Sequence, residues 1–200
     1  ERCFVPYAYR HDWQPYQNGR WLWTAHGWTW DSYDPWGWVT DHYGYWRHHR
    51  SHGWVWFALP DGRWRPMVGS FYYANNSFGW NPYWNGYAAR GYRHGYEHGY
   101  DDGYWQGYQA GAANGSWNRG LTFVPASQFL AQNVYTVRVT SSSAVASSYH
   151  AATAVTGFNG ALISAQYRNP KEFVERTARL NVQVTSINLM QLNTREGGKV

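Results

Sequence analysis

The histidines are the first side chains that could do chemistry, because unprotonated imidazole is a common ligand of transition metals. His48, His49 and His52 cluster in an expected hairpin loop, and His94 and His98 are four residues apart, so that a helix would place both on one face. Neither group has a third ligand at the spacing of a metal-binding motif. Polar residues in a loop need no ligand, and the sequence therefore predicts no metal site and no cofactor.

The carboxylates are the second candidates. Asp31, Asp34 and Asp41 lie between expected hairpins, where they could approach one another. A glycosidase needs two carboxyl groups facing across a cleft at a separation of roughly 5–10 Å. Aspartate in turns explains these positions without catalysis, and the sequence has no nucleophile motif or glycine-rich phosphate loop. The sequence therefore predicts that the protein is not an enzyme.

The elements that hold these residues must fold around aromatic side chains. Aromatic residues make up 20% of the 200 residues, with 15 Trp and 18 Tyr, whereas charged residues make up only 14%. A disordered chain has the opposite composition, so we expect a folded protein. The formal charge of +5 comes from scattered basic residues and favours no nucleic acid. No apolar run reaches the ~18 residues of a membrane helix, and the single Cys3 excludes an internal disulfide.

Residues 1–85 are expected to form a tryptophan-rich β-hairpin domain. A G-x-W motif followed by G-W occurs in residues 19–30 and 44–56, and again in a degenerate copy over residues 62–80. Tryptophans two residues apart, such as Trp21 and Trp23, share one face of a strand. Short strands separated by turn signals predict an antiparallel meander, as a small barrel or a sandwich.

Residues 86–117 have a period of four, which is close to the helical repeat. Seven glycines in a helix cost roughly 1 kcal/mol each relative to alanine, so a helix needs a close partner along the glycine stripe. The alternative is an irregular low-complexity insertion. The candidate interface consists of Gly91, Gly95, Gly99, Gly103, Gly107 and Gly111, with Tyr92, Tyr96, Tyr100, Tyr104 and Tyr108.

Residues 118–200 contain no tryptophan and are expected to form a smaller β-rich part. Alternation predicts a strand over residues 134–140, and a turn at 157–160 predicts a hairpin between 151–156 and 161–166. A helix near 170–179 should begin at Asn169 and Pro170. Apolar residues between 182 and 187 suggest a further strand.

The tryptophan motifs also suggest a family. The motifs GWTW at 27–30, DPWGW at 34–38, HYGxW at 42–46 and GWVW at 53–56 resemble an uncharacterised, tryptophan-rich family of exported bacterial envelope proteins. The resemblance implies export, sometimes as a lipoprotein, and supplies no catalytic residues. A first residue of Glu is consistent with removal of a secretory signal. Residues 66–69 depart from the family pattern, and the glycine repeat looks like an insertion.

Fifteen tryptophans are too many for one buried face of a small sheet, so some should form an exposed binding surface. The alternative is that most of them fill the core. We expect a structural or assembly protein that is periplasmic, outer-membrane-associated or extracellular, contacting copies of itself or other envelope proteins. The second hypothesis is a polysaccharide- or peptidoglycan-binding module. The candidate aromatic surface comprises Trp21, Trp23, Trp28, Trp30, Trp54 and Trp56.

Overall fold

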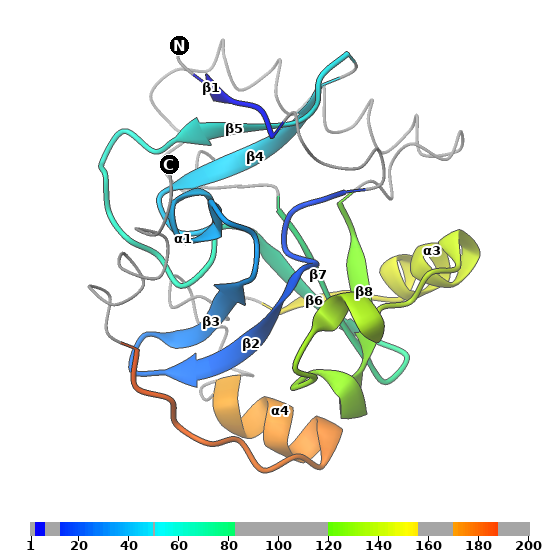
Figure 1. The fold of residues 1–200 in the computed structure, drawn as a ribbon. Coiled ribbons are helices and arrows are strands. Elements are labelled where there is room, and N and C mark those ends of the chain that lie inside the picture. Colours follow the sequence, from blue (N-terminus) through cyan, green and yellow to red (C-terminus); the bar gives the residue numbers. More distant parts are fainter. Residues whose placement is uncertain (1–2, 7–12, 50, 83–119, 156–169, 188–200) are drawn as a thin grey trace, which may run out of the picture.

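The computed structural model describes residues 3–6, 13–49, 51–82, 120–155 and 170–187. In these residues the chain forms three antiparallel sheets with a few short helices packed around them (Figure 1). The expected mostly β, antiparallel fold is therefore confirmed. The described strands form no closed barrel, because every sheet has free edge strands.

The first sheet is the hairpin expected from the first tryptophan motif. Its strands are β2 (Gly19–Thr24) and β3 (Gly27–Ser32). Trp21 lies opposite Trp30, and Trp23 lies opposite Trp28. Facing aromatic pairs of this kind stabilise a hairpin beyond the area they bury.

The second sheet contains the hairpin expected from the second motif. Trp46 lies opposite Trp56 in this hairpin, and a single helical turn, α1 (Gly37–Thr40), connects it to the first sheet. The order of strands is β1 (Cys3–Phe4), β5 (Gly53–Ala58) and β4 (Gly44–His49).

The third sheet joins strands from both sides of the boundary expected near residue 118. Its order is β8 (Thr122–Pro125), β7 (Ser77–Asn81), β6 (Ser70–Ala74) and β9 (Thr153–Val155). Asn75 and Asn76 connect β6 to β7 with φ values of 50° and 54°. Asparagine tolerates this left-handed conformation, and two such residues in succession suit a tight hairpin turn.

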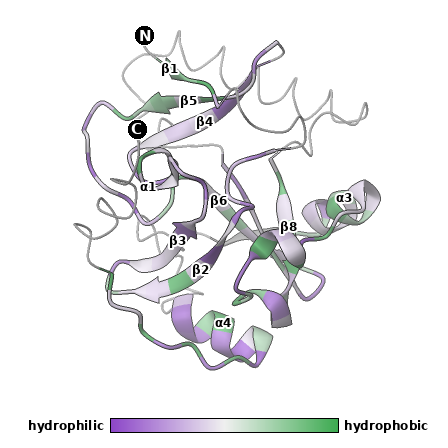
Figure 2. Cartoon of the chain, viewed as in Figure 1, coloured by the Kyte–Doolittle hydropathy of each residue, from purple (hydrophilic) through white to green (hydrophobic). Residues whose placement is uncertain are grey.

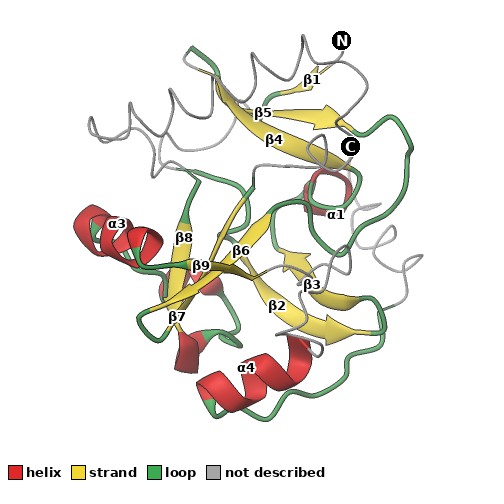
Figure 3. Ribbon diagram, turned by 180° about the vertical axis from the view of Figure 1, so that it is seen from behind, coloured by secondary structure: helices red, strands yellow, loops and turns green. Residues whose placement is uncertain are grey.

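Short helices pack beside the first hairpin and beside the third sheet. The short helix expected near residue 170 is confirmed, and it packs beside the first hairpin, whereas a second helix lies beside β8 (Figure 3). The helices of this part are η3 (Ala126–Gln128), η4 (Val134–Thr136), α3 (Ser142–His150) and α4 (Pro170–Ala178).

The strand expected over residues 134–140 is wrong. The side chain of Asn133 accepts a hydrogen bond from the backbone N–H of Tyr135 at 2.9 Å and caps η4 there. Ser141 likewise accepts from Ala144 N and begins α3, which was not expected. Local capping by short polar side chains therefore outweighs the alternation of apolar residues.

Two other expected strands are only partly present. β9 pairs with β6, while residues 161–166, the other arm of the expected hairpin, lie outside the described residues. Between residues 182 and 187 the structure has no strand but a single parallel bridge from Val184 to Trp23, next to a 2.7 Å hydrogen bond from Thr185 N to Trp23 O.

The core is aromatic. The ring centroid of Trp21 lies 5.1 Å from that of Trp30, 4.8 Å from Phe71 and 5.3 Å from Trp80. Much of β2, β3 and β4 is pale in Figure 2, because hydropathy scales rank indole and phenol rings near the middle of the range. The largest side chains that are essentially inaccessible include Trp21, Trp28, Trp30, Trp46, Trp80, Tyr16, Phe78, Phe123 and Phe129.

No helix within the described ranges has the length and apolar character needed to cross a membrane.

Candidate functional site: a buried carboxylate cluster

Two aspartates flank the helical turn that connects the first two sheets. Asp34 precedes α1 and Asp41 follows it, and they are only 5% and 3% exposed. Gly37 permits this arrangement, because a Cβ atom there would lie 2.1 Å from the Ser32 hydroxyl oxygen and 3.2 Å from an Asp41 carboxylate oxygen. The turn therefore packs closely against β3 and brings both carboxyl groups into the interior.

Asp34 is held by two side-chain donors. Trp13 Nε1 donates to Asp34 Oδ2 at 3.1 Å, and Asn18 Nδ2 donates to Oδ1 at 2.9 Å. Burial raises the pKa of Asp34 above its ordinary value, and the two hydrogen bonds oppose that rise. These donors are what allow a carboxyl group to be buried here.

Asp41 is buried more deeply. Burial raises its pKa to about 7, and the neighbouring charge of Asp34 adds to the rise. Trp46 Nε1 and Thr40 Oγ1 each lie 3.2 Å from Asp41 Oδ1 as donors, and the Ser32 side chain also bonds to this carboxyl group. The pair therefore holds a proton near neutral pH, where most aspartates are fully ionised.

His42, next in the chain, is joined to the loop that follows β5. Its Nδ1 donates to Arg65 O at 2.6 Å, while Arg65 N donates to His42 O at 2.9 Å. The His42 ring stacks on Trp64, with centroids 5.1 Å apart, and His26 contacts Trp64 at 5.0 Å. Burial lowers the pKa of His42 to about 4, so the imidazole is neutral at physiological pH.

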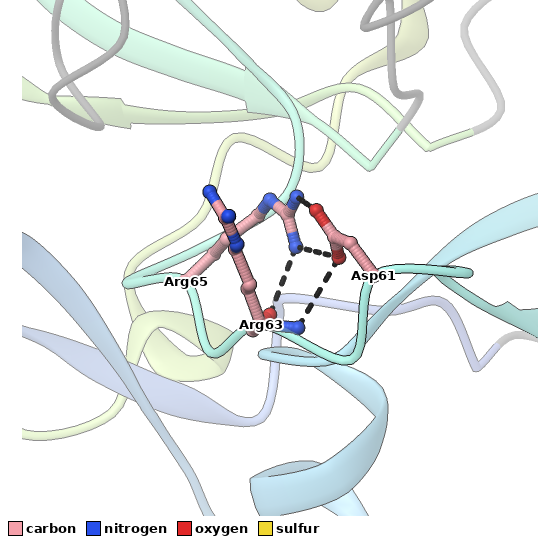
Figure 4. A network of polar contacts seen from close by, with 3 residues as sticks. All are labelled: Asp61, Arg63 and Arg65. Atoms are coloured by element: carbon pink, nitrogen blue, oxygen red, sulfur yellow. Dashed lines mark hydrogen bonds and ion pairs between the residues drawn. The ribbon is translucent and has the colours of Figure 1, made fainter.

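An ion pair shapes the same loop at the surface (Figure 4). Arg65 Nη2 lies 2.6 Å from Asp61 Oδ2, and Arg65 Nη1 donates to Asp61 Oδ1 at 3.2 Å and to Arg63 O at 2.8 Å. Asp61 Oδ1 also accepts from Arg63 N. The two-pronged contact fixes the backbone on both sides of Trp64.

The carboxyl groups of Asp34 and Asp41 are enclosed by the protein. Both are nearly inaccessible and bonded to their own chain, and Asp31, the third candidate, forms a 2.8 Å ion pair with Arg20. Nowhere in the described part of the chain do three His, Cys, Asp or Glu side chains converge to hold a metal ion. The sequence anticipated that Asp34 and Asp41 could approach each other, but it did not identify their indole donors, which lie 21 residues from Asp34 and five residues from Asp41.

The candidate tryptophan surface needs correction. Trp21, Trp28, Trp30 and Trp54 are 2%, 0%, 1% and 6% exposed, because the faces of the hairpins pack on the third sheet and its neighbouring helices. Trp23 and Trp56 are half-buried and lie on different sheets. The six indoles therefore do not share one exposed face.

The other candidate residues are separated by the structure or lie beyond it. His48 packs edge-on against Trp54 at 5.3 Å, whereas His49 and His52 contact each other. Cys3 is exposed and makes no disulfide. His94, His98 and the glycine and tyrosine residues of 86–117 lie outside the described residues.

Comparison with known proteins gives a family match for one part of the chain. Residues 1–87 match a group described as "Family of unknown function (DUF6600)". This match covers the first two sheets and the β6–β7 hairpin, and it stops before β8. No curated protein and no solved structure matches the chain.

Proposed function

We propose that the protein is a non-enzymatic structural protein of the bacterial envelope or cell surface, which packs against copies of itself or against other envelope proteins. The observation that carries this proposal is that Asp34, Asp41 and His42 are shielded from solvent. Each is at most 5% exposed and bonded to its own chain. Their chemistry contributes to the architecture and offers no access to a substrate.

A surface suited to protein contacts lies at the edge of the second sheet. Phe4, on the edge strand β1, is 36% exposed, and its ring lies 5.6 Å from that of the half-buried Trp36. Trp36 in turn contacts Trp13 at 6.0 Å. Aromatic side chains beside a free sheet edge supply both apolar area and backbone hydrogen-bonding groups to a partner.

The envelope location rests on the resemblance carried by the tryptophan motifs, and the self-association rests on the glycine stripe of residues 86–117. Repeated small residues permit close approach of two backbones, and an isolated helix with so many glycines is unstable. A partner packed closely along the glycine stripe would use the small residues for close contact and would stabilise a helix that is unstable alone.

Light scattering on a sizing column tests the proposal directly. We expect the native protein to have a mass that is a multiple of 23.3 kDa. Phe4→Ala should shift it towards the monomer, whereas Tyr135→Ala, at a ring 38% exposed, is the matched control and should leave the mass unchanged. Replacing Gly99, Gly103 and Gly107 together with Leu should abolish assembly.

Two results would overturn this proposal. One is a monomer that binds no envelope protein in pull-downs from its own host. The other is a monomer that binds polysaccharide or peptidoglycan, which would favour the glycan-binding alternative. In that case the half-exposed Trp36 would be the first indole to replace with Ala.

A further inference from the structure

Two histidines meet at the tip of the β4–β5 hairpin, which projects from the body of the molecule (Figure 1). His49 Nδ1 and His52 Nδ1 lie 2.9 Å apart, and the ring centroids are 4.8 Å apart. Both side chains are exposed. Gly53, with a φ of 67°, turns the chain so that the loop returns His52 to His49.

The hydrogen bonds determine which nitrogen carries a proton. Ser51 N donates to His49 Nδ1 at 3.2 Å, so this nitrogen is an unprotonated acceptor. The proton between the two rings therefore belongs to His52 Nδ1. The lone pair of His49 Nδ1 is already directed at its neighbour, and a lone pair on His52 Nδ1 becomes available when the His52 ring changes tautomer.

We propose that His49 and His52 form a binding site for a divalent transition metal, with Cu²⁺ as the preferred ion. Two nitrogens about 2.0 Å from a metal and at right angles to each other lie about 2.8 Å apart, whereas a tetrahedral ion holds them about 3.3 Å apart. The observed 2.9 Å is the length of the hydrogen bond between the rings, and it is close to the first arrangement, so the distance between the two nitrogens need change little when an ion binds. Cu²⁺ favours right-angled nitrogen ligands and heads the affinity series of the divalent ions.

Metal binding at this site is a substitution without redox change. The ion takes the lone pair of His49 Nδ1 in place of the two hydrogen bonds from Ser51 and His52. The His52 proton moves from Nδ1 to Nε2 through solvent, so both rings bind as neutral imidazoles and no net proton is released. Ser51 N–H is exposed with its residue and bonds to water instead.

The described neighbours of the two histidines leave the site accessible. His48 lies on the opposite face of β4, against Trp54. The guanidinium of Arg47 lies 5.2 Å from the centre of the Tyr45 ring, which is farther from the tip than Arg47 itself. Within the described residues, the His49 and His52 rings make polar and ring contacts with each other and with Ser51 N, which leaves coordination positions for water or an external ligand. This inference does not depend on the proposed function.

The test is a Cu²⁺ titration of the full chain, followed by electron paramagnetic resonance and calorimetry. The titrated protein and all its variants also carry His94→Gln and His98→Gln, because that pair offers a second set of imidazoles. We expect one bound Cu²⁺ with hyperfine splitting from two nitrogens. His49→Gln or His52→Gln should weaken binding at least about tenfold, the least expected when a ligand is removed.

His48→Gln is the matched control, since it removes an adjacent imidazole from the other face. It should change the affinity less than about twofold, which lies within the scatter expected for a residue that does not touch the ion. Circular dichroism of each variant separates loss of the site from loss of the fold. Equal affinity in all the variants, or an equal loss with His48→Gln, would overturn the proposal.

Discussion

In the part of the chain that the structure describes, the indole N–H groups of the aromatic core are hydrogen-bonded in one region and unpaired in another. At its centre, the buried N–H groups of Trp21 and Trp30 have no hydrogen-bond partner within the described residues. At the carboxylate junction, formed by Asp34, Asp41 and their donors, Trp13 donates to Asp34 and Trp46 donates to Asp41. One type of side chain thus serves purely as packing volume in one region and as a donor in the other.

The difference follows from the polar groups that each region removes from water: only indole N–H groups at the centre, but carboxyl groups at the junction. An unpaired indole N–H costs roughly 1–3 kcal/mol, which large buried rings and their edge contacts offset. A buried carboxylate without donors costs much more and would protonate or become exposed. The centre therefore needs shape and area, while the junction needs specific partners in specific positions.

The first prediction concerns the centre and has the largest effect. Trp21→Ala removes a ring that is 2% exposed and contacts three other aromatic rings. We expect the free energy of unfolding in urea to fall by about 3–5 kcal/mol. Trp23→Ala, two residues along the same strand and half-buried, should cost clearly less. Equal losses would mean that burial does not determine the contribution of these indoles.

The second prediction uses the opposite titrations of Asp41 and His42. The folded-state pKa of Asp41 is about 7 against an ordinary 3.8, so the folded chain holds an extra proton and Asp41's contribution to stability falls as pH rises through this window. The pKa of His42 is about 4 against an ordinary 6.5, so its contribution rises with pH over nearly the same window. The two slopes nearly cancel in the native protein.

Single substitutions should expose each slope. Between about pH 4.5 and 6.0, Asp41→Asn should gain stability with rising pH relative to the native protein, by about 1.4 kcal/mol per pH unit. His42→Gln should lose stability with rising pH by a similar amount. Urea midpoints at four pH values are sufficient to compare the three proteins. Parallel curves would show that neither group titrates differently in the folded and unfolded chain.

The third prediction compares the two regions directly. Trp46→Phe and Trp21→Phe remove the same volume from buried positions, but only the first removes a donor to a carboxylate. Trp46→Phe should therefore be more destabilising by about 1–3 kcal/mol. The excess should grow above neutral pH, where Asp41 ionises. If Trp21→Phe proves the more damaging, the hydrogen bond to Asp41 contributes little and the junction behaves as ordinary core.

Several of these features could be read from the sequence. Tryptophans spaced by two and glycines at turns correctly predicted the hairpins of residues 19–32 and 44–58. The alternation over 134–140 misled, because one side chain, Asn133, captures the backbone of its neighbour. Such local competition between side chain and backbone leaves no trace in the apolar pattern.

Long-range contacts were beyond the sequence for another reason. β7 pairs with β8 across the whole of residues 83–119, and Gln17 Nε2 donates to Thr122 Oγ1 at 3.1 Å within the core. No spacing rule connects such distant residues. The contacts that bury Asp34 and Asp41, such as those with Trp13 and Trp46, span fewer residues, but turn signals alone do not orient the hairpins that make them.

The smallest expected effect is at the surface clamp of Asp61 and Arg65. Hydrogen bonds from Arg65 and from the backbone of Arg63 lower the pKa of Asp61 to about 2, but the carboxylate is exposed and screened by salt. Asp61→Asn should shift the urea midpoint far less than any substitution at the junction, and the shift should shrink further at high salt. The fluorescence of Trp64 should nevertheless change, because the loop that holds it against His42 loses its ion pair. A midpoint shift as large as that of Trp46→Phe would mean that the exposed Asp61–Arg65 pair also holds the buried carboxylate junction in place. The surface clamp and the junction would then form one structural unit.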